Sequence, residues 1–123
     1  MILVDTSIWI DHLRSGDPQL IAHLQSGEVL IHPFVIGELS LGNLRQRQEI
    51  LGALQDLPKA TKATDIEVLG FIEQAELFGL GIGFVDAHLL ASAKLSANTQ
   101  LWTRDKRLFN AAVRLNLAKQ ELH

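Results

Sequence analysis

The sequence predicts an α/β protein, a three-layer α/β/α sandwich whose central, mostly parallel sheet has four or five strands. Segments with strand and helix patterns alternate along the chain, as they do in folds that join parallel strands through helices. The first strand candidate, residues 1–5, has no polar residue before Asp5, which is typical of a central strand covered on both faces. The 123 residues are 47% hydrophobic, enough for one core, so we expect a single domain over residues 1–123.

Start and stop signals define the elements of the first half of the chain. Asp17 and Pro18 form an aspartate cap followed by a proline at the first helical position, and Gly27 closes that helix. Pro33 opens the next helix in the same way, and Pro58 stops the last one. The expected elements are a strand over 1–5, helices over 7–14 and 18–25, a strand over 28–31, and helices over 33–41 and 45–55.

The second half repeats the alternation of strand and helix. Thr64 or Asp65 caps an amphipathic helix with apolar residues at helical spacing. Asp86 opens a strongly apolar helix whose small residues permit close packing against a sheet, and Asp105 caps the last helix. The expected elements are a short edge strand over 59–64, helices from 65 through Phe78 and from Asp86 to Leu95, a strand over 100–103, and a helix over 106–114.

Composition excludes several classes of site. The chain carries no cysteine, so it forms no disulfide, no thiolate zinc site and no cysteine nucleophile, and any metal must be held by oxygen or imidazole.

The apolar runs are too short to span a bilayer, and Asp5 interrupts the N-terminal run with no basic region before it, unlike a signal peptide. We therefore expect a cytoplasmic protein without membrane contact.

The net charge of −3 argues against a nucleic-acid partner, since phosphate binding favours basic surfaces. The charge is unevenly distributed, however. Residues 101–123 carry five basic and two acidic side chains, a balance of +3, whereas residues 49–86 carry two basic and seven acidic side chains, a balance of −5. The C-terminal segment is therefore the part of the chain suited to face phosphate.

Carboxylates occupy similar places in several of the expected elements. Asp5 and Asp105 follow strands, Asp86 starts a helix, and Glu38 lies early in a helix that follows a strand. Ligands of open α/β sheets gather at the carboxyl ends of the strands, where these residues are expected. The structural alternative is that Asp86 and Asp105 are helix caps and that Glu38 is a solvated side chain.

Four converging carboxylates would repel one another unless a divalent cation kept them ionised together. An oxygen-only set favours Mg²⁺ or Mn²⁺ over Zn²⁺, and such a site suits hydrolysis of a phosphodiester. Thr6, Ser7 and Thr103 are placed to orient the carboxylates or a phosphate, although hydroxyl residues are also ordinary turn and cap residues.

The ordered set of acidic motifs resembles the PIN domain, specifically the VapC-type toxins of bacterial toxin–antitoxin pairs. The resemblance covers essentially the whole chain, and its strength lies in the order of motifs that are weak individually. The motifs are Val4-Asp5-Thr6-Ser7, Ile36-Gly37-Glu38-Leu39, Val85-Asp86-Ala87-His88-Leu89-Leu90-Ala91-Ser92-Ala93 and Trp102-Thr103-Arg104-Asp105-Lys106-Arg107-Leu108.

The resemblance implies an endoribonuclease that depends on Mg²⁺ or Mn²⁺ and is inhibited by a small VapB-type antitoxin covering the acidic site. It assigns catalytic and metal-binding positions to Asp5, Glu38, Asp86 and Asp105, and supporting polar positions to Ser7 and Thr103. The final acidic residue varies within the family, so direct metal binding by Asp105 stays open.

Surface residues point to further partners. Arg104 and Lys106 flank Asp105, so they are candidates for contacts with RNA phosphates, the alternative being a solvated helix face. The positive mean hydropathy of +0.16 indicates more apolar surface than a monomer exposes, and a homodimer or a larger assembly with an antitoxin would cover it.

Two other functions compete with the nuclease. An aspartate-nucleophile phosphatase needs a second aspartate two residues after the first, where this chain has Ser7. The remaining alternative is a catalytically inactive PIN-like module that binds RNA or protein. Mutual repulsion among four retained carboxylates argues against that module, because without a metal nothing would offset the repulsion.

Overall fold

The computed structural model describes residues 1–121 and contains a short parallel sheet with its most apolar strand in the centre. The strands are β1 (Ile2–Val4), β2 (Val29–Leu30) and β3 (Gln100–Trp102), in the order β2-β1-β3. Ile2 of β1 pairs with Val29 on one side and with Gln100 on the other. The central place of β1 confirms the prediction from its uninterrupted apolar sequence.

The sheet has three strands in the described residues, so the prediction of four or five was wrong. The segment expected as an edge strand over 59–64 contributes a single parallel bridge, between Ile31 and Lys59. Beyond Ala60 the backbone leaves the sheet, because the N–H of Thr61 donates to the Ser96 hydroxyl at 3.0 Å instead of to a strand. The opposite edge is extended in the same limited way by a bridge between Leu101 and Ala118.

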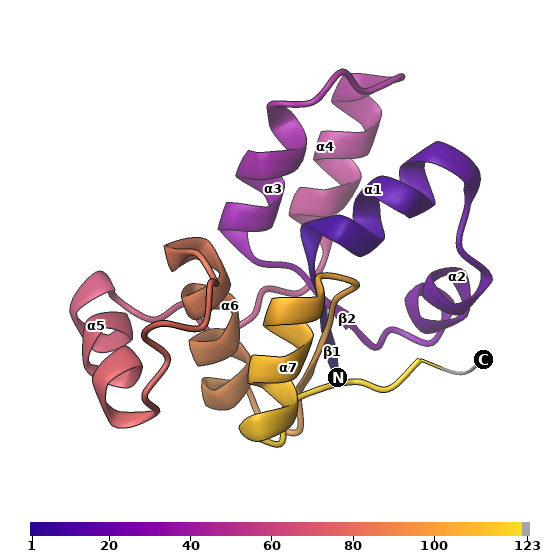
Figure 1. Cartoon of the computed structure of the whole chain (residues 1–123). Helices are drawn as coiled ribbons and strands as arrows, with labels where there is room; N and C mark the ends of the chain where they lie inside the picture. Colours follow the sequence, from indigo (N-terminus) through magenta and orange to yellow (C-terminus); the bar gives the residue numbers. More distant parts are fainter. Residues whose placement is uncertain (122–123) are drawn as a thin grey trace.

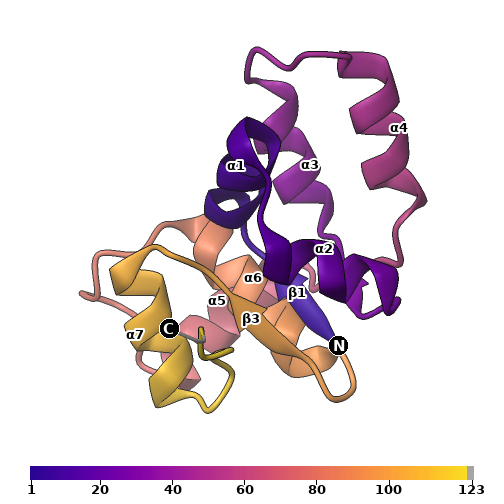
Figure 2. The same ribbon diagram turned by 90° about the vertical axis from the view of Figure 1, so that its right-hand side faces the viewer.

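Helices lie on both sides of this sheet (Figures 1 and 2). In Figure 1 α5 and α6 lie on one side and α1 and α2 on the other, while both views show that α3 and α4 project from the sheet as a hairpin. The helices are α1 (Thr6–Ser15), α2 (Pro18–Gln25), α3 (Pro33–Ser40), α4 (Arg47–Asp56), α5 (Asp65–Gln74), α6 (Phe84–Leu95) and α7 (Lys106–Arg114).

Two helix boundaries differ from the sequence prediction. Helix α6 begins at Phe84 and not at Asp86, because Asp86 lies at the third helical position and accepts a hydrogen bond from the backbone N–H of Gly83. Helix α5 ends at Gln74 and not at Phe78, and Glu76 just beyond it has a φ of 54°. The guanidinium of Arg114 donates to the carbonyl oxygens of Ala75 and Glu76, which satisfies this helix end from a distant part of the chain.

The core holds the strand ends in place. Leu3, Val4, Leu101 and Trp102 are fully buried, so β1 and β3 are covered on both faces up to their last residues. Because the strands are parallel, their carboxyl ends lie at one edge of the sheet. The residues that follow them, Asp5 after β1 and Thr103 after β3, are therefore fixed next to each other by buried backbone.

Over residues 1–121, none of the helices has the length and apolar character needed to cross a membrane.

Candidate metal-binding active site

Asp5 lies at the carboxyl end of the central strand and is held by two hydroxyl groups. Its side chain is almost buried, with the residue 6% exposed, and its backbone N–H donates to the carbonyl of Trp102 at 2.9 Å. The Oδ2 atom accepts hydrogen bonds from Ser7 Oγ at 2.9 Å and from Thr103 Oγ1 at 2.7 Å. Within the part of the chain that the structure describes, no protein group donates to Oδ1, so one oxygen of this carboxylate is held and the other is free to bind a ligand.

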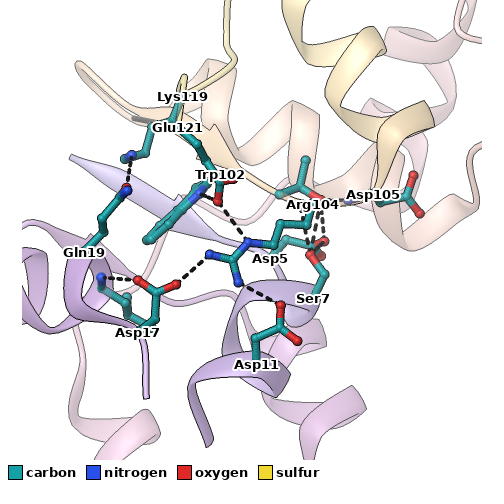
Figure 3. Close-up of polar contacts among 12 residues, drawn as sticks. Asp5, Ser7, Asp11, Asp17, Gln19, Trp102, Arg104, Asp105, Lys119 and Glu121 are labelled. Atoms are coloured by element: carbon teal, nitrogen blue, oxygen red, sulfur yellow. Dashed lines mark hydrogen bonds and ion pairs between the residues drawn. The ribbon is translucent and has the colours of Figure 1, made fainter. Parts of the chain in front are cut away.

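The two hydroxyl residues join the start of α1 to the end of β3 (Figure 3). Ser7 Oγ accepts from the backbone N–H of Arg104 at 3.1 Å, and Thr103 Oγ1 accepts from the backbone N–H of Asp105 at 3.0 Å. Each hydroxyl thus accepts one hydrogen bond and donates one, so Asp5 is oriented by groups that are themselves fixed. The sequence had placed both hydroxyl residues at supporting positions, and the structure puts both on Asp5.

The other three carboxylates are each bound to a nearby donor. Glu38, which is exposed on α3, accepts from Thr6 Oγ1 at 2.8 Å. Asp86 accepts from the N–H of Gly83 at 3.1 Å, and Asp105 caps α7 by accepting from the N–H of Leu108 at 3.0 Å. The helix-capping alternative is therefore correct for Asp105, and in part for Asp86, which serves its helix from the third position.

The negative charges of Asp5, Glu38 and Asp105 all act on Asp86. Partial burial raises the pKa of this side chain, the hydrogen bond from Gly83 opposes the rise, and repulsion by Asp5, Asp105 and Glu38 adds to it. Capping alone does not explain this arrangement, since a helix cap needs no other carboxylates around it. The four predicted residues therefore form one acidic edge, which we define as Asp5, Glu38, Asp86 and Asp105.

The acidic edge fits a divalent cation by its chemistry but is not arranged as a finished coordination site. Its donors are carboxylate and hydroxyl oxygens, the set that Mg²⁺ and Mn²⁺ prefer. In the described residues, no three acidic or histidine side chains are arranged to hold a metal ion together. The local hydrogen bonds of Glu38, Asp86 and Asp105 explain this, because each turns its carboxylate toward its own helix or toward Thr6.

Arg104, a candidate for RNA contact, is engaged by three carboxylates (Figure 3). Its guanidinium binds Asp17 at 2.5 Å, Asp11 at 2.7 Å and Glu121 at 2.9 Å. The hydrogen bond with Asp17 is the main cause that raises the pKa of Arg104. Burial raises the pKa of Asp17, but the hydrogen bond from Arg104, the backbone hydrogen bonds from Leu20 and Gln19 and the charge of Arg104 together lower it below its usual value. This arginine joins α1, the loop before α2 and the C-terminal segment.

Sequence reasoning missed this ion-pair cluster because its partners are far apart in the chain. Arg104 lies 93 residues from Asp11 and 87 from Asp17, so no local motif relates them. Lys106, the other candidate for RNA contact, is exposed at the first position of α7 and forms no hydrogen bond or ion pair with described residues.

Two buried histidines belong to the helices that carry Glu38 and Asp86, one at the N-terminal cap of α3 and one within α6. His32 caps α3, where its Nδ1 accepts from the N–H of Phe34 at 3.0 Å. His88 on α6 binds the Asp65 carboxylate through Nε2 at 2.9 Å, and the two rings lie 6.3 Å apart. Burial, followed by the positive charges of His88 and Lys62, lowers the pKa of His32 to about 4.

The low pKa of His32 predicts a loss of stability in acid. Between pH 6.5 and about 4 the unfolded chain binds a proton at this residue and the folded chain does not. The free energy of unfolding should therefore fall with decreasing pH by up to about 1.4 kcal/mol per pH unit from this group alone. Urea denaturation at pH 7.5, 5.5 and 4.5 measures the fall.

The variant His32→Asn isolates this contribution, because an asparagine retains an acceptor for the cap and does not titrate. Its stability should vary less with pH than that of the wild type in this range. Equal pH slopes for the two proteins would show that His32 does not remain neutral in the fold.

Comparison with known proteins shows the family of the chain. Residues 2–114 match the sequence profile of the PIN domain. The chain is 46% identical over 121 residues to Ribonuclease VapC32 of Mycobacterium tuberculosis, in the strains CDC 1551 / Oshkosh and H37Rv, and the match covers 98% of both chains.

Solved structures show the same fold. FitAcB from Neisseria gonorrhoeae superposes with a TM-score of 0.64 at 24% identity, over 96% of this chain and 95% of that one. PAE2754 from Pyrobaculum aerophilum gives a TM-score of 0.59 at 20% identity, over 97% and 90% of the two chains. The profile match and the nearly full-length identity together establish that the chain belongs to the PIN-domain family, among its VapC-type members.

Proposed function

We propose that this chain is the toxin of a type II toxin–antitoxin pair, an endoribonuclease that hydrolyses RNA phosphodiester bonds with Mg²⁺ or Mn²⁺. The observation that carries the proposal is the 46% identity, over 98% of both chains, to a protein named as a ribonuclease. The acidic edge supplies a chemical reason for the activity, because its oxygen donors suit the cations that assist phosphodiester hydrolysis.

Asp5, Glu38, Asp86 and Asp105 would hold the cation. When bound, it lowers the pKa of a water molecule and offsets the charge of the phosphate. Ser7 and Thr103 fix Oδ2 of Asp5, and no group in residues 1–121 donates to Oδ1, which leaves that oxygen available to a cation. Glu38 is exposed and, among residues 1–121, its side chain has Thr6 as its hydrogen-bond partner, so it can turn toward the site at small cost.

The mutual repulsion of the four carboxylates has a direct consequence for stability. A cation at the acidic edge offsets the repulsion that raises the pKa of Asp86. Mg²⁺ or Mn²⁺ should therefore raise the melting temperature, with a gain of about 2.7 kcal/mol when the cation is at 100 times its Kd. Differential scanning fluorimetry with increasing Mn²⁺ measures the shift.

The variant Asp86→Asn should reduce this shift, whereas Asp56→Asn, which changes an exposed carboxylate on α4, should preserve it. An equal shift in all three proteins would mean that the cation binds elsewhere.

Cleavage itself tests the proposed function. The chain, purified free of any partner, is incubated with total RNA in Mn²⁺ or in EDTA, and new RNA ends are mapped by sequencing. Cuts at defined positions that appear only with Mn²⁺ support the proposal. Metal-induced stabilisation without any cut RNA would instead favour a PIN-like binding module.

The surface is consistent with protein partners, which we propose to be a VapB-type antitoxin that covers the acidic edge and a second copy of this chain. Large apolar side chains are exposed on α5 and in the segment after it, with Ile66 81% and Phe78 60% exposed. Light scattering of the purified chain, alone and with its antitoxin, measures both associations. A strictly monomeric chain would contradict the homodimer.

A further inference from the structure

A hollow of about 490 Å³ opens beside the acidic edge, between α1, α3 and the start of α4. Glu38 belongs both to the acidic edge and to the lining of this hollow, so the two are continuous. Resting on the proposed function, we infer that the hollow binds an unpaired nucleotide of the substrate RNA next to the bond that is cut.

Charge is the first argument for an RNA ligand. Arg14 on α1 and Arg45 in the loop between α3 and α4 both line the hollow and are exposed. Among residues 1–121 neither arginine has a hydrogen-bond or ion-pair partner. By contrast, Arg104 binds three carboxylates, and Arg47 donates to the carbonyls of Ser40 and Gly42. Arg14 and Arg45 are therefore available to bind phosphates on either side of the nucleotide.

The lining supplies the second argument. Ile10, which is 43% exposed, and Leu13 provide apolar surface against which the face of a base can lie, and Asn43 offers an amide that donates and accepts hydrogen bonds. The volume lies within the range of roughly 300–1,000 Å³ typical of sites for small ligands. Proteins read unpaired RNA through this combination of stacking, edge contacts and phosphate contacts.

The two arginines also offset the repulsion between the acidic edge and a negatively charged RNA. The chain has a net charge of −3, and its four clustered carboxylates repel a polyanion unless a cation is bound. Arg14 and Arg45, which line the same hollow as Glu38 and have no partner among residues 1–121, provide attraction that does not depend on the metal. They would hold the strand in place while the acidic edge acts on the adjacent phosphate.

The test uses the full chain and an RNA with one mapped cleavage site, in Mn²⁺. Arg14→Gln and Arg45→Gln should each raise KM about tenfold with little change in kcat, since each removes a charged contact to the strand. The slope of the logarithm of the RNA-binding constant against the logarithm of the salt concentration should become less steep in each variant, by the amount that corresponds to about one phosphate contact. Arg14→Lys, which retains the charge, should recover much of the affinity.

Lys94→Gln is the matched control, because it removes one positive charge from α6, away from this hollow. Asn43→Ala should leave the salt dependence unchanged and alter the preferred base beside the cut. If the wild type cuts RNA and both arginine variants behave like Lys94→Gln, the hollow does not hold RNA. If, in addition, the two arginine variants bind the antitoxin more weakly, the hollow belongs to the antitoxin interface. A wild-type protein that cuts no RNA would instead contradict the proposed function.

Discussion

Replacing Asp5 by asparagine is expected to slow RNA cleavage roughly 100- to 1,000-fold, because a charged ligand of the acidic edge is lost. Catalysis by a bound cation contributes several kcal/mol, and about 1.4 kcal/mol corresponds to each tenfold in rate. An asparagine oxygen can still accept from the hydroxyls of Ser7 and Thr103, so the fold should persist. Initial rates on an RNA with one cleavage site, at saturating Mn²⁺, measure the loss.

The substitutions Thr103→Val and Asp56→Asn provide the comparison. Thr103→Val removes one of the two hydroxyls on Asp5 and should cost less than Asp5→Asn, since Ser7 still orients the carboxylate. Asp56→Asn changes an exposed carboxylate outside the acidic edge and should leave the rate unchanged. An Asp5→Asn protein that cuts at the wild-type rate would remove Asp5 from the active site.

Arg104→Gln is expected to lower the free energy of unfolding by roughly 2–4 kcal/mol. The loss leaves Asp17, whose side chain is only 12% exposed, without its charged partner, and breaking a buried pair from one side costs about 3–5 kcal/mol. Asp11 and Glu121 are more exposed and recover part of their hydration, so they add little. Urea denaturation at pH 7 measures the change.

The variants Arg104→Lys and Asp11→Asn show which ion pairs around Arg104 contribute to stability. A lysine retains the charge but cannot present the planar, branched donors that contact three carboxylates at once, so it should restore stability only in part. Asp11→Asn should cost less than about 1 kcal/mol, as exposed ion pairs do. Equal losses for Asp11→Asn and Arg104→Gln would show that the pair with Asp17 adds no stability.

The fold was predictable where local sequence determines it. An apolar run before Asp5 identified the central strand, and Pro18, Pro33 and Asp105 marked helix starts that the structure contains. The number of strands was not predictable, because the path of the segment after Pro58 depends on a hydrogen bond from Thr61 to Ser96, which lies 35 residues further along the chain. Asp86 was read as the residue that opens α6 although it acts from the third helical position, a distinction that depends on the conformation of Gly83.

In the candidate site, too, local sequence identified some residues, and the others depend on the tertiary structure. Asp5, Asp86 and Asp105 could be named because they follow strands or stand at helix starts, and parallel strands bring such positions together. Glu38 was expected early in its helix but lies in the last turn of α3. The cluster around Arg104 and the hollow lined by Arg14 and Arg45 could not be found, because each combines elements that only the tertiary structure brings together. Arg104 also shows that a basic residue next to an active-site motif can be occupied by carboxylates instead of RNA.

A crystal of the chain soaked in Mn²⁺, with anomalous scattering recorded at the manganese edge, locates the bound cation. We expect an anomalous peak within coordination distance of Asp5 Oδ1 and Asp86, with Glu38 turned away from Thr6 toward the ion. If the wild-type protein cuts RNA in Mn²⁺ but its anomalous peaks all lie away from the acidic edge, these carboxylates do not form the active site.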